Sequence, residues 1–292
     1  MTRIQRLSRS LAWLFISATV ASGVFAATIE RTGGPYVPTP EAVVDHMLRI
    51  GNVSEKDYVI DLGSGDGVIV LTAARLYKAS GMGIEIDPAL VKLSNDSAKK
   101  FGIADRVRFV EQDVFKTDLS RATVVTLYLL PAMMLNLRSK IFNELQPDVR
   151  VVSHDYHFGE WRPDDSVSFD VPEKEKITGI PSATVYIWHV PAKIAGTWSI
   201  KVAGADTYDL NVKQRFQVID ATAITSGKPV RVQYASLRGN DFTMAVPDGK
   251  GVARYTGRVN GDSIEGSVDF AGNKPAARWT ATRTLPGSVV IE

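Results

Sequence analysis

Three acidic side chains follow predicted strands in this chain, and the first of them begins a run of closely spaced glycines. Asp61 opens the segment DLGSGDG, in which Gly63 and Gly65 alternate with polar residues. Glycine lets the backbone approach a ligand closely and adopt turn conformations, and the helix after such a loop presents free N–H groups. Glu85 in GIEID lies at the end of the next predicted strand, and Asp113 in EQDV follows the third. The pattern is typical of a site for a small polar ligand.

These side chains suit different parts of a nucleoside. A carboxylate at the end of the second strand accepts hydrogen bonds from ribose hydroxyls, which is the role expected of Glu85. Asp113, after the third strand, is placed to accept a hydrogen bond from an adenine amino group. Ligands of parallel sheets bind at the carboxyl ends of the strands, so all three carboxylates are expected at one edge of the sheet. The sequence therefore predicts a nucleoside site.

The elements that must position these residues alternate between strands and helices. Apolar, β-branched segments predict strands, and apolar residues at helical spacing predict helices. The predicted strands are residues 58–61, 83–86, 107–110, 123–127 and 149–153, and the predicted helices include residues 43–48, 68–76, 88–101 and 132–145. Two further strands, 166–171 and 184–190, have no predicted helix between them and form an expected antiparallel hairpin. This order predicts a mostly parallel sheet covered on both faces.

The pattern changes after Pro191, where strand follows strand. Apolar residues alternate with polar ones at residues 208–212, 230–234 and 264–270, and Trp279 is expected in a last strand. The segments GND at 239–241 and NGD at 260–262 predict hairpin turns. Residues 196–285 are therefore predicted to form a small antiparallel β-domain, a meander or partial barrel of about 90 residues. Nothing in this segment indicates chemistry of its own, so it is expected to stabilise or dock.

Composition narrows the function classes. The chain has 292 residues, a formal net charge of +2 and no cysteine. That length accommodates two domains, and the near-neutral charge gives no indication of a nucleic-acid partner. The lack of cysteine excludes disulfides, thiolate metal sites and cysteine nucleophiles. No metal site is predicted.

The N-terminal segment has the features of a signal peptide. Arg3, Arg6 and Arg9 precede an apolar run over residues 11–25, and small residues lead up to Ala27. Residues 1–26 are therefore predicted to direct export and to be cleaved, leaving the protein periplasmic or associated with the cell envelope. The run is short for a membrane span, which needs about 20 apolar residues. The alternative is an uncleaved segment that anchors the chain to the membrane.

Taken together, the motifs resemble a known family. DLGSGDG, GIEID and QDVF are similar to the first three motifs of class I S-adenosylmethionine-dependent methyltransferases, and the likeness covers residues 35–191. PYVPTP at 35–40, TLYLLP at 126–131 and SHDYHFGEW at 153–161 resemble a subgroup of that family. The subgroup includes bacterial relatives of the lysine methyltransferases that act on the ATP synthase c-subunit.

The resemblance implies a fold, a cofactor and roles for single residues. The expected fold is α/β, a Rossmann-like doubly wound sheet with an antiparallel terminal hairpin, followed by the β-domain, and the expected cofactor is S-adenosylmethionine. The residues implied to bind it are Asp61, Gly63 and Gly65 at the methionine part, Glu85 at the ribose, and Asp113 with Val114 at the adenine. The implied activity is methyl transfer to a protein nitrogen such as that of lysine.

The acceptor side is less defined by the motifs. A lysine amine has a pKa near 10.4 in water and must lose its proton before it attacks, which a dry aromatic pocket favours. Tyr128, at the end of the fourth predicted strand, is the candidate catalytic residue, and Tyr36 and Asp155 are candidates for the substrate pocket. The alternative for the two tyrosines is plain packing. TLYLLP also stands where many amino-methylating relatives carry an Asn or Asp followed by two prolines and an aromatic residue.

Other functions fit the same residues less well than methyl transfer. Neighbours on one strand point to opposite faces, so Ser153, His154 and Asp155 are not expected to form a hydrolase triad. A nicotinamide dehydrogenase also carries a strand-end acid, but its glycine spacing differs from the one found here. A non-catalytic nucleoside-binding envelope protein derived from a methyltransferase stays open as the main alternative.

Overall fold

The computed structural model describes residues 34–248, 251–272 and 275–291. The predicted signal peptide, residues 1–26, lies outside these ranges, and so does the question of whether it is cleaved. Within the described ranges, every helix is too short or too polar to cross a bilayer.

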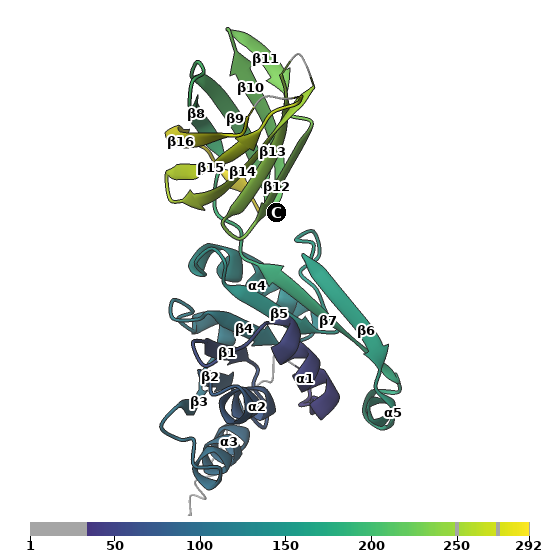
Figure 1. The fold of residues 1–292 in the computed structure, drawn as a ribbon. Helices are drawn as coiled ribbons and strands as arrows, with labels where there is room; N and C mark the ends of the chain where they lie inside the picture. The colour runs from purple at the N-terminus through teal and green to yellow at the C-terminus, as the bar shows by residue number, and fades with distance from the viewer. Residues whose placement is uncertain (1–33, 249–250, 273–274, 292) are drawn as a thin grey trace, which may run out of the picture. The chain divides into compact units, whose positions relative to one another are not determined.

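A seven-stranded sheet occupies the first part of the described chain (Figure 1). Its strands are β1 (Tyr58–Leu62), β2 (Ser80–Glu85), β3 (Val107–Glu111), β4 (Val124–Leu127), β5 (Arg150–His154), β6 (Asp165–Asp170) and β7 (Ser182–His189). Their order across the sheet is β3-β2-β1-β4-β5-β7-β6, with all pairs parallel except β5–β7 and β6–β7. This arrangement confirms the predicted doubly wound sheet with an antiparallel end.

Helices cover both faces of this sheet. They are α1 (Glu41–Ile50), α2 (Val68–Leu76), α3 (Pro88–Lys100), α4 (Pro131–Glu144) and α5 (Pro172–Thr178), with a short 3₁₀ helix η1 (Val114–Lys116). Alternate residues of each strand point to opposite faces, so Val59 packs among the residues of α1, α2 and α3, while Ile60 packs with α4. Figure 1 shows α1, α2 and α3 gathered on one side of the strands.

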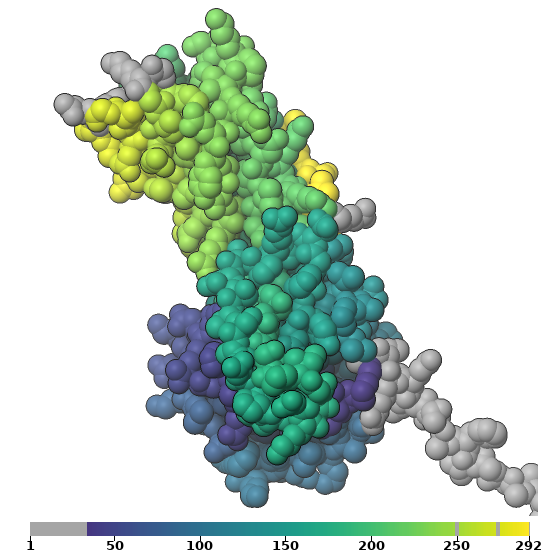
Figure 2. All heavy atoms as spheres, turned by 90° about the vertical axis from the view of Figure 1, so that its right-hand side faces the viewer, coloured from purple at the N-terminus to yellow at the C-terminus, as the bar shows by residue number. Residues whose placement is uncertain are grey.

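The prediction of no helix between the last two strands of the sheet is wrong. α5 lies between β6 and β7, begins with Pro172 at its first position and ends at Gly179, which adopts φ +76. Proline is favoured at the start of a helix and glycine just after its end, so both signals are present in the sequence. Figure 2 is viewed from the side on which β6 and α5 lie, and their teal-green atoms stand toward the viewer.

The rest of the described chain forms a second sheet of ten strands. The strands are β8 (Gly196–Val202), β9 (Tyr208–Arg215), β10 (Val218–Thr225), β11 (Lys228–Arg231), β12 (Tyr234–Arg238), β13 (Asp241–Pro247), β14 (Val252–Asn260), β15 (Ser263–Asp269), β16 (Ala277–Pro286) and β17 (Val289–Val290). Their order is β11-β10-β9-β8-β16-β15-β14-β13-β12, and all of these pairs are antiparallel.

Local chemistry explains most of this second sheet. The hairpins at Gly239 and Gly261 turn where the sequence predicts, because both glycines adopt positive φ angles. The structure corrects two details. Residues 230–234 do not form one strand, because the chain bends between β11 and β12 at the buried Val232. β17 follows the strand that holds Trp279 and pairs with β9 in parallel.

One side chain from the β9–β10 turn belongs to the core of the first sheet. Phe216 adopts φ +50 and is 1 % exposed. Its ring stacks on Trp161 with centroids 5.7 Å apart and meets Phe142 edge-on at 5.5 Å. Burying an aromatic side chain removes a large apolar area from water, so this contact ties the second sheet to the first.

Candidate active site

The glycine loop connects β1 to α2 with three left-handed residues. Gly63, Gly65 and Gly67 have φ angles of +79, +53 and +81, a region that side chains with a Cβ rarely adopt. The space is also restricted, because a Cβ on Gly63 would lie 2.6 Å from Leu129 and one on Gly65 would lie 2.6 Å from Tyr36. Glycine is therefore required at both positions by conformation and by space.

Glu85 ties this loop to the end of the second strand. Its Oε2 accepts a hydrogen bond from Gly65 N at 2.9 Å, and its Oε1 accepts from Ile86 N at 2.8 Å and Asp87 N at 3.0 Å. A carboxylate has about four lone-pair sites for hydrogen bonds, so three backbone donors leave about one free. One ribose hydroxyl can donate a hydrogen bond to this free position on the Glu85 carboxylate. A second hydroxyl can donate only if one of the three backbone N–H groups gives up its hydrogen bond.

Asp61 sits beneath the loop and is almost completely enclosed. Its side chain is 2 % exposed, and its Oδ1 accepts a hydrogen bond from Thr126 Oγ1 at 2.6 Å. Burial raises the pKa of Asp61 to about 7, and the nearby charges of Asp66 and Glu85 add to the rise, while the Thr126 hydrogen bond opposes it. A cationic group near Asp61 would favour its charged form.

Asp113 and Val114 stand at the end of β3. Asp113 caps η1 by accepting a hydrogen bond from Phe115 N at 2.9 Å, and its side chain is 38 % exposed. Val114 is buried in the same core as Leu62 and Ile84. The Asp113 Oδ2 lies 3.8 Å from Lys116 Nζ, and a carboxylate with about four lone-pair sites still has room for a further donor.

These groups fit the adenosyl part of S-adenosylmethionine. Glu85 and Glu111 are the last paired residues of β2 and β3, and Leu62 pairs with Ile84. The loop and two carboxylates thus occupy neighbouring strand ends on one edge, where ligands of parallel sheets bind. We call the residues 61–67, 85–87 and 111–114 the donor end of the sheet.

Tyr128 lies at the next part of the same edge. Leu127 pairs with Leu62 on one side and with Ser153 on the other, so Tyr128 follows directly between the glycine loop and β5. Its ring stacks on His154 with centroids 3.9 Å apart and lies parallel to Tyr156 at 6.3 Å. Burial raises the pKa of Tyr128 to about 12, so the phenol keeps its proton at neutral pH. We call Tyr128, residues 153–156 and Lys174 the acceptor end.

Asp155 does not present a free carboxylate. It adopts φ +61, its Oδ1 accepts from Thr184 N at 3.1 Å, and its Oδ2 forms a short ion pair with Lys174. Lys174 comes from α5, is 2 % exposed and also donates to Ser182 O at 2.7 Å. Buried charges are expected to be paired in this way, so the predicted pocket residue Asp155 fixes the turn after β5.

Tyr36 lies against the glycine loop of the donor end. Its ring packs against Gly65, and burial, together with the charge of Asp66 and a hydrogen bond with it, raises the pKa of its phenol. Tyr36 remains 40 % exposed and therefore covers the glycine loop from the solvent side.

Sequence patterns do not reveal two residues of this site. Thr126 is expected only as part of a strand, but its hydroxyl is the hydrogen-bond donor to Asp61. Lys174 is hidden because α5 is not predicted, although the proline and glycine that flank the helix signal it. Within the described ranges, no group of three or more His, Asp or Glu side chains is placed to hold a metal ion.

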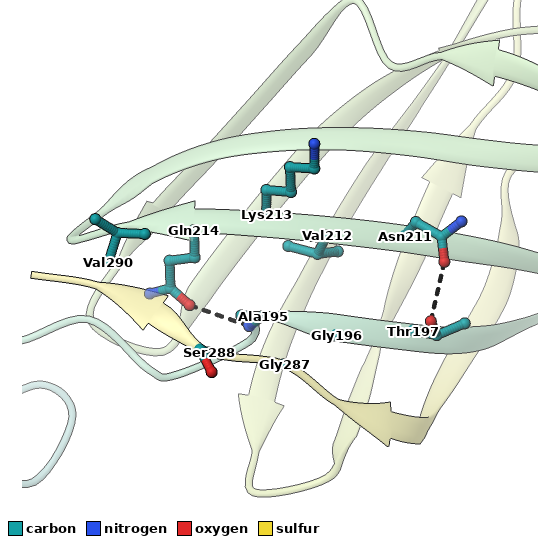
Figure 3. A pocket seen from close by; sticks show the side chains of 10 residues that line it. All are labelled: Ala195, Gly196, Thr197, Asn211, Val212, Lys213, Gln214, Gly287, Ser288 and Val290. Atoms are coloured by element: carbon teal, nitrogen blue, oxygen red, sulfur yellow. Dashed lines mark hydrogen bonds between the residues drawn. The ribbon is translucent and has the colours of Figure 1, made fainter.

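A separate hollow of about 360 Å³ lies in the second sheet, between β8, β9 and β17 (Figure 3). Three of its polar side chains bond to their neighbours: Thr197 with Asn211 at 3.0 Å, and Gln214 with the backbone N–H groups of residues 194 and 195. The hollow contains none of the predicted cofactor residues, and its lining shows no group arranged for chemistry.

Comparison with known proteins finds methyltransferases with sequences similar to this chain. A sequence profile of the ANTKMT methyltransferase domain matches residues 61–165. A protein-lysine N-methyltransferase of Saccharolobus islandicus is 38 % identical over 155 residues, which are 53 % of this chain and 92 % of that protein. The lysine N-methyltransferase of Xenopus laevis that is named for the ATP synthase c-subunit is 34 % identical over 145 residues, 50 % of this chain and 63 % of that protein.

A solved structure is also similar. An RNA methyltransferase from Salinibacter ruber, crystallised with S-adenosylhomocysteine, is 49 % identical with a TM-score of 0.49, over 54 % of this chain and 96 % of that one. The matches to the two lysine methyltransferases span about half of this chain.

The fold, the donor end and the matched profile define an S-adenosylmethionine-dependent methyltransferase domain. Within that class, the chain belongs to the same family as the archaeal protein-lysine N-methyltransferase. Its cofactor is S-adenosylmethionine, as the motifs predict. The roles of the single site residues stay predictions.

Proposed function

We propose that this protein transfers a methyl group from S-adenosylmethionine to the side-chain amine of a lysine in an envelope protein. The observation that carries the proposal is the order of groups along one sheet edge. The glycine loop and Glu85 lie on one side of Tyr128, and the aromatic residues after β5 lie on the other. The relatives named as lysine N-methyltransferases support the choice of acceptor.

The donor-end residues bind and orient the methyl donor. When bound, S-adenosylmethionine supplies an electrophilic methyl group on a positively charged sulfur. Glu85 accepts from its ribose, Asp113 accepts from its adenine amino group, and the glycine loop surrounds the methionine part. The buried carboxylate of Asp61 stabilises the positive charge of that part, because opposite charges attract strongly where water is excluded.

The acceptor-end residues favour an uncharged amine. An aromatic wall excludes water, which disfavours the ammonium form and lowers the pKa of a lysine that enters. The displacement forms a bond between nitrogen and the methyl carbon, breaks the bond between carbon and sulfur, and leaves the electron pair on sulfur. The product amine then carries the positive charge. Alignment is the main contribution of the protein, and the order of the strand ends supplies it.

Labelled methyl transfer tests this function directly. The chain lacking residues 1–26 is incubated with methyl-labelled S-adenosylmethionine and an envelope-protein extract from cells that lack the protein. Mass spectrometry is expected to find methylated lysine in a protein of the extract, and the Glu85→Ala variant is expected to give far less. Label in RNA, or cofactor binding without any incorporation, contradicts the proposal. The second outcome favours the non-catalytic binding protein.

We also propose that the protein works outside the cytoplasm. The support is the N-terminal sequence alone, with its three arginines, its apolar run and the small residues before Ala27. Peptide mapping of the protein from fractionated cells tests this point. A mature chain that begins near Ala27 in the periplasmic or envelope fraction is expected, whereas an intact Met1 in the cytosol contradicts export. An intact N-terminus in the membrane fraction favours the uncleaved anchor.

A further inference from the structure

His154 is a buried polar side chain with no hydrogen-bond partner. It is the last residue of β5, its side chain is 0 % exposed, and neither ring nitrogen makes a hydrogen bond. Nε2 lies 3.4 Å from Asp155 Oδ2, but that oxygen is held by Lys174. Buried polar groups are nearly always paired, and an unpaired one costs stability. Such a group is a candidate for a contact that a ligand completes.

The position of His154 relates it to the reaction. The strands lie in the order β1, β4, β5, so His154 at the end of β5 lies two strands away from the glycine loop that follows β1. At about 4.8 Å per strand, the loop and the imidazole are about 10 Å apart. Tyr128 lies between them and stacks on the imidazole. A methyl donor on the loop and an acceptor at His154 would therefore meet near Tyr128.

The ring of His154 is uncharged at neutral pH. Burial lowers the pKa of His154 to about 4, and the nearby Lys174 lowers it further, while Asp155 opposes both. In a neutral imidazole one ring nitrogen donates a hydrogen bond and the other accepts one. The ring therefore offers a lone pair and no positive charge that would repel an amine or a sulfonium.

We propose that His154 binds the acceptor amine, its unpartnered ring nitrogen accepting a hydrogen bond from the amine N–H. This inference rests on the lysine acceptor proposed above. The imidazole is enclosed and Tyr128 covers one of its faces, so the amine reaches the ring edge, where the nitrogens lie, only when the side chains around that edge move. His154 holds the amine and does not act as its base, because a group with so low a pKa removes few protons from an ammonium. The proton is lost to water before the amine attacks.

The replacement His154→Phe separates this role from packing. Phenylalanine keeps a flat ring that stacks on Tyr128 but has no ring nitrogen. The variant is expected to bind S-adenosylhomocysteine as the parent does and to lose at least about tenfold in the initial rate of lysine labelling, the effect of one hydrogen bond to the amine. It is also expected to unfold at a temperature about 2–4 °C higher, because two unpaired buried nitrogens are removed.

The proposal predicts that His154→Phe raises the unfolding temperature and lowers the rate of lysine labelling, and each change can be measured by itself. A second variant, His154→Gln, keeps a hydrogen-bond acceptor and is expected to recover part of the rate lost in His154→Phe. An unfolding temperature below that of the parent for His154→Phe, or an undiminished rate, overturns the proposal. The thermal measurement needs no acceptor, so it tests His154 by itself. Absence of lysine labelling by the parent defeats the proposed function first, and the role of His154 with it.

Discussion

The donor end and the acceptor end are built from the same sheet edge by different means. At the donor end, Glu85 accepts three backbone hydrogen bonds and Asp61 accepts one from Thr126. At the acceptor end, Lys174 fixes Asp155 from a helix inserted between two strands, and the neighbouring His154 has no partner. The donor end is held mainly by backbone hydrogen bonds to its carboxylates, although the buried Ser64 Oγ of its glycine loop has no partner, while the acceptor end is held by an ion pair from an inserted helix.

The largest expected effect of a substitution is a loss of stability when the ion pair between Lys174 and Asp155 at the acceptor end is broken. Lys174→Met removes one partner of a buried pair, which costs about 3 kcal/mol in the free energy of unfolding. Because the pair lies two strands from the glycine loop, the affinity for S-adenosylhomocysteine is expected to be unchanged. Denaturant unfolding and calorimetry measure the two quantities. Lys176→Met, an exposed lysine of the same helix, is the control and is expected to be neutral.

The next largest effect is expected on cofactor affinity, when the Glu85 carboxylate of the donor end is removed. Glu85→Ala removes charge-assisted hydrogen bonds worth about 1.5–3 kcal/mol, so affinity for S-adenosylmethionine is expected to fall about ten- to a hundredfold. Glu55→Ala is the control, because this exposed carboxylate precedes β1 at the opposite edge of the sheet and lies outside the donor end. Asp113→Ala is expected to weaken binding less, since adenine offers it a neutral donor. Equal affinities for the Glu85 variant and the parent would show that the ribose is held elsewhere.

The glycine loop is expected to give a somewhat smaller effect. Gly65→Ala places a side chain at φ +53 and 2.6 Å from the ring of Tyr36. The left-handed conformation alone costs about 1–2 kcal/mol, which corresponds to about tenfold in affinity when the loop must keep its shape. Gly102→Ala has a similar φ of +67 with open space around it and lies outside the donor end, so it is the control and is expected to leave cofactor affinity unchanged. If cofactor affinity is the same in both variants and the parent, the loop does not surround the ligand.

The pH dependence of cofactor binding probes Asp61. The pKa of Asp61 is about 7 in the folded chain, against an ordinary value of 3.8. Between these two pH values the Asp61 carboxyl is protonated in the folded chain and ionised in the unfolded chain. The free energy of unfolding therefore falls as pH rises from about 4 to about 7. Positively charged cofactor favours the ionised form, so affinity for S-adenosylmethionine is expected to rise about tenfold per pH unit below 7 and then level off. Calorimetry of Asp61→Asn should show no such rise.

The two ends also differ in how far the sequence predicts them. The glycine loop and Glu85 are predictable because strand, turn and helix follow one another within a short segment, where spacing fixes the geometry. The acceptor end depends on contacts across strands. His154 meets Tyr128 only because β4 and β5 pair, and Lys174 reaches Asp155 only through the fold of the β6–β7 insertion. Residue spacing does not show such contacts.

The second sheet is predictable for a different reason. Alternation of apolar and polar residues directly reflects a strand with one buried face, and residues 208–212 follow it in β9. Phe216 breaks that rule. It lies in a turn, where an apolar side chain is expected to be exposed, yet it is buried against Trp161 of the first sheet. Only the folded chain shows where that side chain goes.

Hydrogen exchange tests most directly whether the cofactor binds at the donor end of the sheet edge and not at the acceptor end. The chain lacking residues 1–26 is compared with and without saturating S-adenosylhomocysteine, and the protection of backbone amides is measured along the chain. Residues 63–67, 85–87 and 112–115 are expected to exchange more slowly with the ligand, while residues 153–157 are expected to be unchanged. Protection confined to residues 153–157, or none at the glycine loop, would contradict the placement of the cofactor at the donor end.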